Sequence, residues 1–204
     1  ALEASDFTLT LSGGTATLSS ATPSSISSSS NTYTLGLSLS GTPNGSETIT
    51  VVPSSSTAIY DAAGNAASTS QSNNTVTLND KTAPTLSSVS IASNNSTSTL
   101  AAVGDNVTLT FTASETISTP VVTFLSGGAA ITDTSVTYVN TSGNIWTAAY
   151  TANASDTDGS VTYSIAFSDS AGNAGTAVTS GSGSVTFDKT APTLSSVSIA
   201  SNNS

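Results

Sequence analysis

Apolar and polar residues alternate with a period of two in many short segments of this chain. In Val107–Ala113 every second residue is apolar and the residues between are threonines, and Val161–Phe167 alternates in the same way. Such alternation is typical of a strand with one buried face and one solvent-exposed face. The same pattern predicts further strands at Phe7–Leu11, Tyr33–Leu39, Ile49–Val51 and Trp146–Tyr150.

The fold class is therefore predicted to be all-β. No segment has the apolar spacing of an amphipathic helix, and Leu, Glu, Lys and Arg are too few to build one. Because Ser and Thr dominate and only 7% of residues are charged, a disordered low-complexity chain is the alternative. The regular alternation favours a folded chain instead.

Between residues 80 and 187 the sequence predicts seven strands separated by Gly, Asn and Ser turns. Seven short strands in this order fit an immunoglobulin-like β-sandwich. The predicted strands, lettered A to G in chain order, are Thr85–Ala92, Asn106–Ala113, Val121–Leu125, Ser135–Val139, Ile145–Thr151, Ser160–Phe167 and Ser184–Phe187.

Two internal repeats share one offset. Residues Asp80–Ser96 recur letter for letter as Asp188–Ser204, 108 residues later. The turn sequence Asp-x-Ala-Gly-Asn occurs at Asp61–Asn65 and, at the same offset, at Asp169–Asn173. Because 108 residues is about the length of one sandwich domain, the repeats predict a tandem array of modules.

The repeat also predicts the module boundaries. Ser12-Gly13-Gly14 aligns with Ser126-Gly127-Gly128, which follows the third predicted strand of the middle module. We therefore expect residues 1–79 to form an immunoglobulin-like module that lacks its first strands, and residues 80–187 to form a complete one. Residues 188–204 are expected to supply the first strand of a third module.

The composition excludes several kinds of function. The chain has two lysines, no arginine and twelve acidic residues, with a net charge of −10, so it lacks the basic surface that nucleic-acid binding requires. Without His or Cys it cannot build the usual zinc, haem or iron–sulfur sites, a disulfide or a Ser–His–Asp triad. No apolar run is long enough to cross a membrane.

The turns and the linker carry a resemblance to a known family. An Asp-x-Ala-Gly-Asn turn, then a strand and Asp-Lys-Thr-Ala-Pro, resembles the bacterial immunoglobulin-like repeats of giant surface adhesins. Gly104–Phe111 with Ser114-Glu115 is similar to a B strand and B–C loop of that family, and Ser5–Gly14 and Tyr33–Leu35 to a related variant. The resemblance implies a sandwich fold, calcium at the linkers, a cell-surface stalk that presents a separate adhesive tip, and no enzymatic activity.

Carboxylates are the main candidate chemistry, and sandwich topology sorts them into two groups. We expect the start of strand A to gather with the B–C, D–E and F–G loops at one pole, and the A–B, C–D and E–F loops with the end of strand G at the other. Such oxygen-rich clusters suit Ca²⁺, which takes six to eight oxygen ligands; ordinary Asp and Asn turn chemistry is the alternative. The candidates are Asp80, Glu115, Asp169 and Asn173 at the upper pole, and Asp105, Asp156, Asp158 and Asp188 at the lower pole.

Other chemical interpretations are weaker. Asp156 and Asp158 lie in one turn, which argues against a glycosidase pair, and Lys81 and Lys189 lie in polar linkers, which argues against a Lys–Asn isopeptide bond. Trp146 shares one strand face with apolar residues and is predicted to fill the core rather than to form a sugar-binding platform. Exposure of Trp146, Tyr138 and Tyr163 distinguishes these two interpretations.

Two structural roles remain open, with neighbouring modules of the same chain or of adjacent copies as the expected partners. The first is a calcium-stiffened stalk of a giant bacterial surface adhesin. The second is a self-assembling extracellular filament or surface-layer subunit, in which the unmatched strand Thr193–Ala200 of one copy is donated to the incomplete first module of the next. The missing strands are expected to leave that module's apolar residues Leu9, Leu11, Leu35, Leu37 and Val51 uncovered. A carbohydrate-binding appendage is a third class.

Overall fold

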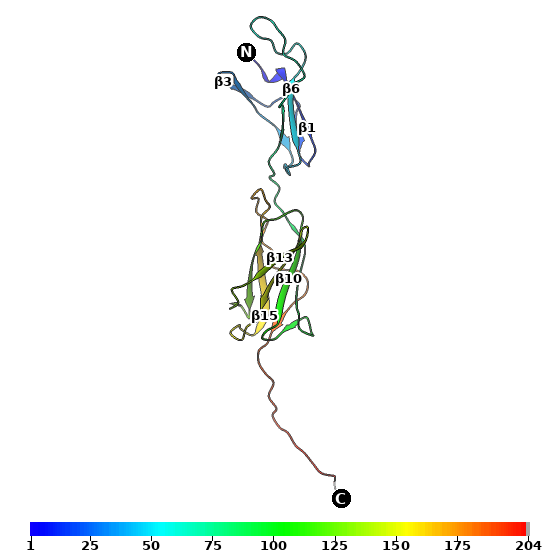
Figure 1. Ribbon diagram of the computed structural model, residues 1–204, viewed down its shortest axis with the longest axis vertical. Helices are drawn as coiled ribbons and strands as arrows, with labels where there is room; N and C mark the ends of the chain where they lie inside the picture. Colours follow the sequence, from blue (N-terminus) through cyan, green and yellow to red (C-terminus); the bar gives the residue numbers. More distant parts are fainter. Residues whose placement is uncertain (203–204) are drawn as a thin grey trace. The chain divides into compact units, whose positions relative to one another are not determined.

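The computed structural model describes residues 1–202, which divide into two compact units. The first unit comprises Ala1–Ala83, and the second begins at Pro84, four residues after the boundary that the repeat predicts. Apart from the 3-10 helix Ala4–Asp6, the regular elements of the described residues are β-strands (Figure 1). The all-β prediction is confirmed.

The first unit is built on a three-stranded antiparallel sheet in the order β1-β6-β7. In it Leu9 lies opposite Val51, and Leu11 lies opposite Ile49. The two paired strands contain the segments Phe7–Leu11 and Ile49–Val51, whose alternation predicted them from the sequence. The strands are β1 (Phe7–Ser12), β6 (Thr48–Pro53) and β7 (Thr75–Thr77).

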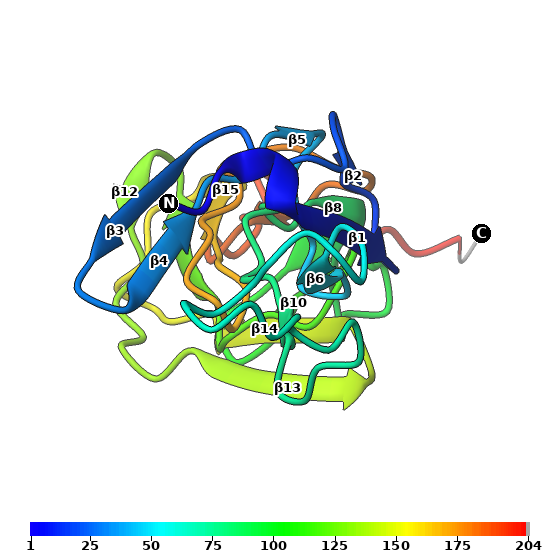
Figure 2. The same ribbon diagram turned by 90° about the horizontal axis from the view of Figure 1, so that it is seen from above.

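Two short antiparallel pairs complete the first unit. In one, β3 (Ile26–Ser29) forms a hairpin with β4 (Thr32–Leu35), and the two strands lie side by side in Figure 2. In the other, β2 (Thr17–Leu18) pairs with β5 (Leu39–Ser40). The single strand expected over Tyr33–Leu39 is therefore wrong in its extent, because the chain leaves β4 after Leu35 and starts a different pairing at Leu39.

The first unit covers its apolar residues unevenly. Leu9 is only 3% exposed, contrary to the expectation that the missing strands leave it open. The returning segment explains this, since the Leu9 N–H donates to the carbonyl of Ala21 at 2.7 Å. Leu37 is 39% exposed, while Leu11, Leu35 and Val51 are half-buried.

The second unit contains two sheets. The four-stranded sheet has the order β13-β14-β10-β8, and the five-stranded sheet has the order β12-β11-β15-β16-β9. All pairs are antiparallel except β16–β9. The first sheet consists of β8 (Leu86–Ser93), β10 (Asn106–Ala113), β13 (Thr137–Ser142) and β14 (Ile145–Thr151). The second consists of β9 (Leu100–Ala101), β11 (Val121–Ser126), β12 (Ala129–Ala130), β15 (Gly159–Ala166) and β16 (Thr186–Phe187).

Both sheets of the second unit bury their alternate residues in one apolar core, which makes this unit sandwich-like. Leu109 and Phe111 of β10 are fully buried, as is Ile165 of β15 in the other sheet. The rings of Phe124 and Tyr150, from the two different sheets, lie 4.9 Å apart between centroids. The period-two pattern therefore identified the faces that the two sheets share.

Most of the seven strands predicted for this unit are confirmed with small shifts. The bounds of β10 and β14 are as predicted, and those of β8, β11 and β15 differ by about one residue. The fourth strand, β13, begins and ends later than expected because a register irregularity between Asn140 and Ser142 carries its pairing further. The two-residue strands β9 and β12 were not predicted, since they are too short to alternate.

Residues 188–202 contain no strand, although Thr193–Ala200 was predicted to form one. A strand needs a neighbour to accept its backbone hydrogen bonds, and this chain offers none to that segment. Leu194 and Val197 are more than 80% exposed, and Ile199 is 99% exposed. Asn203 and Ser204, which end the second copy of the repeat, lie outside the described residues.

Candidate functional site

Two of the predicted upper-pole acids lie together at one end of the second unit. Glu115 follows the end of β10 by two residues, and Asp169 follows β15. An isolated bridge between Ile117 and Asp169 holds the two loops side by side. As a result, a carboxylate oxygen of Glu115 and one of Asp169 lie within 4.8 Å of each other.

The carboxylate of Asp169 is organised by its own turn. Its Oδ1 accepts the N–H of Asn173 at 2.8 Å, and its Oδ2 accepts the Nδ2 of the same residue at 2.7 Å. Burial acts to raise the pKa of Asp169, but these hydrogen bonds and those from the backbone of Gly172 and Ala171 hold it below its ordinary value. Asp169 is therefore a buried, ionised carboxylate.

The equivalent turn in the first unit has the same internal bonds. Asp61 Oδ1 accepts the N–H of Asn65 at 2.8 Å, and Oδ2 accepts the Asn65 Nδ2 at 2.9 Å. Gly64 adopts a φ of 90° and its counterpart Gly172 a φ of 91°. The motif is thus a self-contained turn, and forming the turn explains its residues without a ligand.

Asp80, which was also predicted at the upper pole, belongs to the first unit. There its Oδ1 accepts the N–H of Thr82 at 2.8 Å. The following Lys81 N–H and the Thr82 hydroxyl both donate to the carbonyl of Pro43, at 2.9 and 3.1 Å. The linker that carries Asp80 is therefore fastened to a loop of its own unit.

At the lower end of the second unit, Asp158 and Asp188 lie against the same short segment. Asp158 Oδ1 accepts the N–H of Lys189 at 2.9 Å, and its Oδ2 accepts the Thr190 hydroxyl at 2.9 Å. Asp188 Oδ1 accepts the N–H of Thr190 at 2.8 Å. The Lys189 N–H, then the Thr190 hydroxyl, lower the pKa of Asp158.

The other two lower-pole candidates have structural partners. Asp156 is 1% exposed, and it accepts the N–H and hydroxyl of Thr132 and the N–H of Asn153, at 2.8 to 2.9 Å. Asp105 accepts Nδ2 of Asn95 and the N–H of Ala102, which lower its pKa. Within residues 1–202, these lower-pole acids do not form a group of three carboxylates with oxygens inside 4.8 Å.

Sequence reasoning missed two carboxylates that hold loops. Glu47 is fully buried; its Oε1 accepts the N–H groups of Thr15 and Ala16, and its Oε2 accepts that of Asn44. The Ala16 N–H contributes most to lowering its pKa to about 2, against the opposing effect of burial. Asp133 similarly accepts the N–H of Ser135 in its own loop and the N–H of Thr151 at the end of β14. The sequence did contain a signal for Glu47. It is a single acidic residue between a glycine-containing turn and an alternating strand, a position from which a carboxylate can bind loop N–H groups.

The aromatic and lysine alternatives can be judged from burial and contacts. Trp146 and Tyr163 are less than 10% exposed and Tyr138 is half-buried, so these three residues do not form an exposed sugar-binding row. The prediction that Trp146 fills the core is confirmed. Lys189 Nζ donates to the backbone carbonyls of Ala154 and Asp156, which is the environment of a hydrogen-bonded ammonium rather than of an isopeptide bond.

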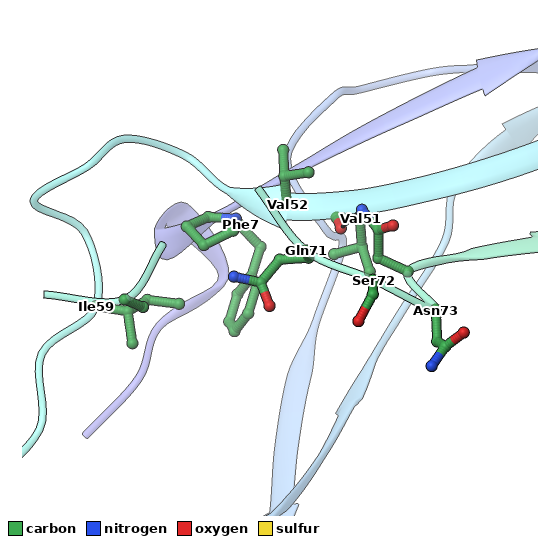
Figure 3. Close-up of a pocket in the computed structure, with 10 residues that line it drawn as sticks. Phe7, Val51, Val52, Ile59, Gln71, Ser72 and Asn73 are labelled. Atoms are coloured by element: carbon green, nitrogen blue, oxygen red, sulfur yellow. Dashed lines mark hydrogen bonds between the residues drawn. The ribbon is translucent and has the colours of Figure 1, made fainter. Parts of the chain in front are cut away.

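The first unit has an apolar groove, which Figure 3 shows in close-up. A cavity of 310 Å³ lies over β6, with Phe7 and Ile59 at one end and Ser72 and Asn73 at the other. A second cavity of 180 Å³ extends it along β7 and shares Val51, Asn73 and Asn74 with the first. We call the two together the β7 groove.

Neither the protein-family models, nor the curated proteins, nor the solved structures gave a match to this chain. In residues 1–202 there is no helix with the length and hydropathy that crossing a bilayer would require.

Proposed function

We propose that this chain is part of the repeat region of an extracellular bacterial surface protein of the adhesin type. In this proposal its two units are immunoglobulin-like sandwich modules that act as a non-catalytic spacer, and the binding specificity lies in another part of the protein. The observation that carries the proposal is that the strand registers, followed from the aligned Ser-Gly-Gly turns, reach a pair of residues with the 108-residue offset of the sequence repeats.

The registers can be followed strand by strand. If Ser12 is aligned with Ser126, their opposite residues Thr48 and Val161 are aligned as well. Thr48 lies opposite Thr77, and the Val161 N–H donates to Val185 at 2.8 Å. Thr77 and Val185 are 108 residues apart, which is the offset of the repeated turn and linker. Two successive strand pairings in each unit thus lead to the correspondence that the repeats suggest.

We further propose that Ca²⁺ binds at the upper end of the second unit through Glu115 and Asp169. Thr85 and Ser114 exchange hydrogen bonds, so the start of this unit lies beside the residue that precedes Glu115. Asp80 is five residues before Thr85, and a chain of that length spans at most about 17 Å. Chain connectivity therefore allows Asp80 to supply a linker oxygen, and such a ligand would restrict the motion of the linker.

Asp158 and Asp188 are the candidates for a second calcium site. They lie against the same linker segment at the lower end, where the sequence of the first linker is repeated. A stalk with calcium at successive linkers would resist bending wherever extracellular calcium exceeds the dissociation constant.

Thermal unfolding with and without calcium tests the proposal, with the fluorescence of Trp146, the single tryptophan, reporting the second unit. Millimolar calcium over a site of about 10 μM affinity would stabilise this unit by about 2.7 kcal/mol. Solution scattering should also show a narrower distribution of extended forms with calcium than with EDTA.

The matched variants are Asp169→Ala and Asp61→Ala, which change the same turn in the two units, and Asp6→Ala as a distant control. Glu115→Gln removes the negative charge of one ligand without altering the turn. We expect Asp169→Ala and Glu115→Gln to abolish the calcium-dependent rise in melting temperature, and Asp61→Ala and Asp6→Ala to keep it. Equal melting curves and scattering profiles in calcium and in EDTA would contradict the calcium proposal.

A further inference from the structure

Two loops of this chain, one in each unit, share the sequence Asn-x-Ser followed by an acid. They are residues 44–47 and residues 153–156. In both loops the Asn N–H donates to the carboxylate three residues later, at 2.9 Å, and that carboxylate is buried. In both, Oδ1 of the Asn accepts the N–H of the serine two residues later, at 3.1 Å in the first unit and 2.9 Å in the second. The loops therefore have the same internal bonds.

The two loops differ at the residue that follows the Asn. Gly45 follows Asn44, whereas Ala154 follows Asn153, and Asn44-Gly45 is the single Asn-Gly pair in the sequence. Gly45 has a φ of 80°, which an L-residue adopts only with strain, while Ala154 does not have a positive φ. The peptide nitrogen after an Asn is the nucleophile of deamidation, and a glycine leaves that nitrogen free of the Cβ that would hinder its attack.

The turn favours that attack at Asn44. A side chain that bonds to the N–H two residues later is folded over the peptide bond between, which brings Cγ of Asn44 close to the nitrogen of Gly45. The Ser46 N–H, already bonded to Oδ1, also stabilises the negative charge that develops on this oxygen during the attack. The folded loop thus supplies both proximity and electrostatic stabilisation.

We propose that Asn44 is a site of spontaneous deamidation in the folded chain. The deprotonated nitrogen of Gly45 attacks Cγ of Asn44, a new N–C bond closes a succinimide ring, and the side-chain amide takes up a proton and leaves as ammonia. Water then opens the ring at either of its carbonyl carbons, which leaves an aspartate or an isoaspartate in place of Asn44. Water is the only co-reactant.

The modification falls on the loop that fastens the linker. The carbonyl of Pro43, next to Asn44, accepts the Lys81 N–H at 2.9 Å and the Thr82 hydroxyl at 3.1 Å. In the isoaspartate product the main chain passes through Cβ and is longer by a methylene group. The loop then cannot keep all its present bonds, so the hold of Pro43 on the linker should weaken.

The added charge acts in the same direction. Oε2 of the buried Glu47 accepts the Asn44 N–H, so the new carboxylate arises beside an existing one. Asp80 is also near, since a Cβ on Gly45 would lie 3.2 Å from the Cβ of Asp80. Like charges at such short range repel one another. The proposal depends neither on calcium nor on the function proposed above.

Mass spectrometry of the full chain, incubated in its folded state, tests the inference. Trypsin cleaves after Lys81 and Lys189, so Asn44 and Asn153 fall on different fragments, residues 1–81 and 82–189. Asn44 should convert at least about tenfold faster than Asn153. Its rate should rise with pH, because the nucleophile is a deprotonated nitrogen. Fragmentation of each peptide locates the modified residue.

Two variants supply matched controls. Asn44→Ser keeps an oxygen that can accept the Ser46 N–H but has no amide to lose, so it should remove the modification from this loop. Ala154→Gly changes an exposed residue and places a glycine after Asn153 in the equivalent turn. It should therefore make Asn153 deamidate. Failure of Ala154→Gly to do so would contradict the role given to the turn and its glycine.

The unfolded chain gives the reference rate, because in denaturant the Asn-Gly pair reacts by its sequence alone. A folded chain whose Asn44 stays intact while the unfolded chain converts, or equal conversion of Asn44 and Asn153, would overturn the inference. As conversion proceeds, amide exchange of Lys81 should increase and that of Lys189 should not. Unchanged exchange of Lys81 in a fully deamidated chain would overturn the proposed weakening of the linker.

Discussion

The sequence that begins at Asp80 occurs twice in this chain, and its two copies have different structures. In the first copy Leu86–Ser93 form β8, paired with β10, and Ile91 is 5% exposed. In the second copy the same residues form no strand, and Ile199 is 99% exposed. Identical alternation thus gives a strand where a sheet is present to pair with it and an unpaired segment where none is.

The other repeated sequence behaves differently. The turns Asp61–Asn65 and Asp169–Asn173 form the same bonds in both units, although Asp61 is exposed and Asp169 is buried. These bonds join residues within five positions of one another. A turn whose bonds are local is determined by its sequence, whereas a strand is determined by its sequence together with its partner.

The largest expected effect comes from truncating the same residue in both copies. Ile91→Ala should lower the free energy of unfolding of the second unit by about 2–5 kcal/mol, because it leaves a cavity in the core. Ile199→Ala should change it by less than about 0.5 kcal/mol. Denaturant unfolding followed by Trp146 fluorescence measures both. Equal losses for the two variants would mean that the second copy also packs within its own unit.

A smaller loss of stability is expected from replacing Asp156, whose loop binds the second copy of the linker sequence. Lys189 donates to the carbonyl of Asp156, whose carboxylate in turn binds Thr132 and Asn153. Asp156→Asn places an amide N–H against the N–H of Asn153 and should cost the second unit about 1.5–3 kcal/mol. Ser155→Ala, in the same loop, is the control. If the two variants unfold alike, the buried carboxylate does not hold this loop.

The two glycines of the repeated turn should give matched effects. Gly64→Ala and Gly172→Ala meet no neighbouring atom within 4 Å, but both residues have a φ near 90°, which an L-residue tolerates poorly. Each substitution should cost its own unit about 1–2 kcal/mol. Hydrogen exchange resolved by unit measures both losses. A loss in one unit alone would show that the turn depends on its surroundings.

The last expected effect concerns Glu47, whose contribution to stability is constant near neutral pH and changes only in acid. Its pKa in the folded chain, about 2, lies below the ordinary value of 4.5. The stabilisation is therefore complete above about pH 4.5 and is lost as the pH falls toward 2. Hydrogen exchange of β6 should increase over this range, and Glu47→Gln should flatten the dependence. A profile that the variant leaves unchanged would assign the acid response to other carboxylates.

Much of the fold was accessible from the sequence because its strands alternate strictly. The bounds of β10 and β14 follow from Val, Leu, Phe, Trp and Tyr on one face and Thr or Ala on the other. The short strands β9 and β12 have too few residues to show a period. The unpaired state of residues 193–200 could not be predicted either, since nothing in a strand's own residues reveals whether a partner is present.

The candidate site was accessible only in part. Topology brought Glu115 and Asp169 to one end of the second unit, because both follow strands that end there. The sequence could not show that Asp156 is used by Thr132 and Asn153, or that Glu47 holds the loop of Thr15. Both acids bind mainly backbone N–H groups, which nearly every residue has, so the sequence does not identify their partners.

Amide exchange of the two copies of the repeat, measured by NMR, tests most directly whether the segment becomes a strand only where a sheet accepts it. At low protein concentration Ile91, which is 5% exposed in β8, should be strongly protected, and Ile199, which is 99% exposed, should exchange as an unstructured residue. Protection of Ile199 comparable to that of Ile91 would contradict the account.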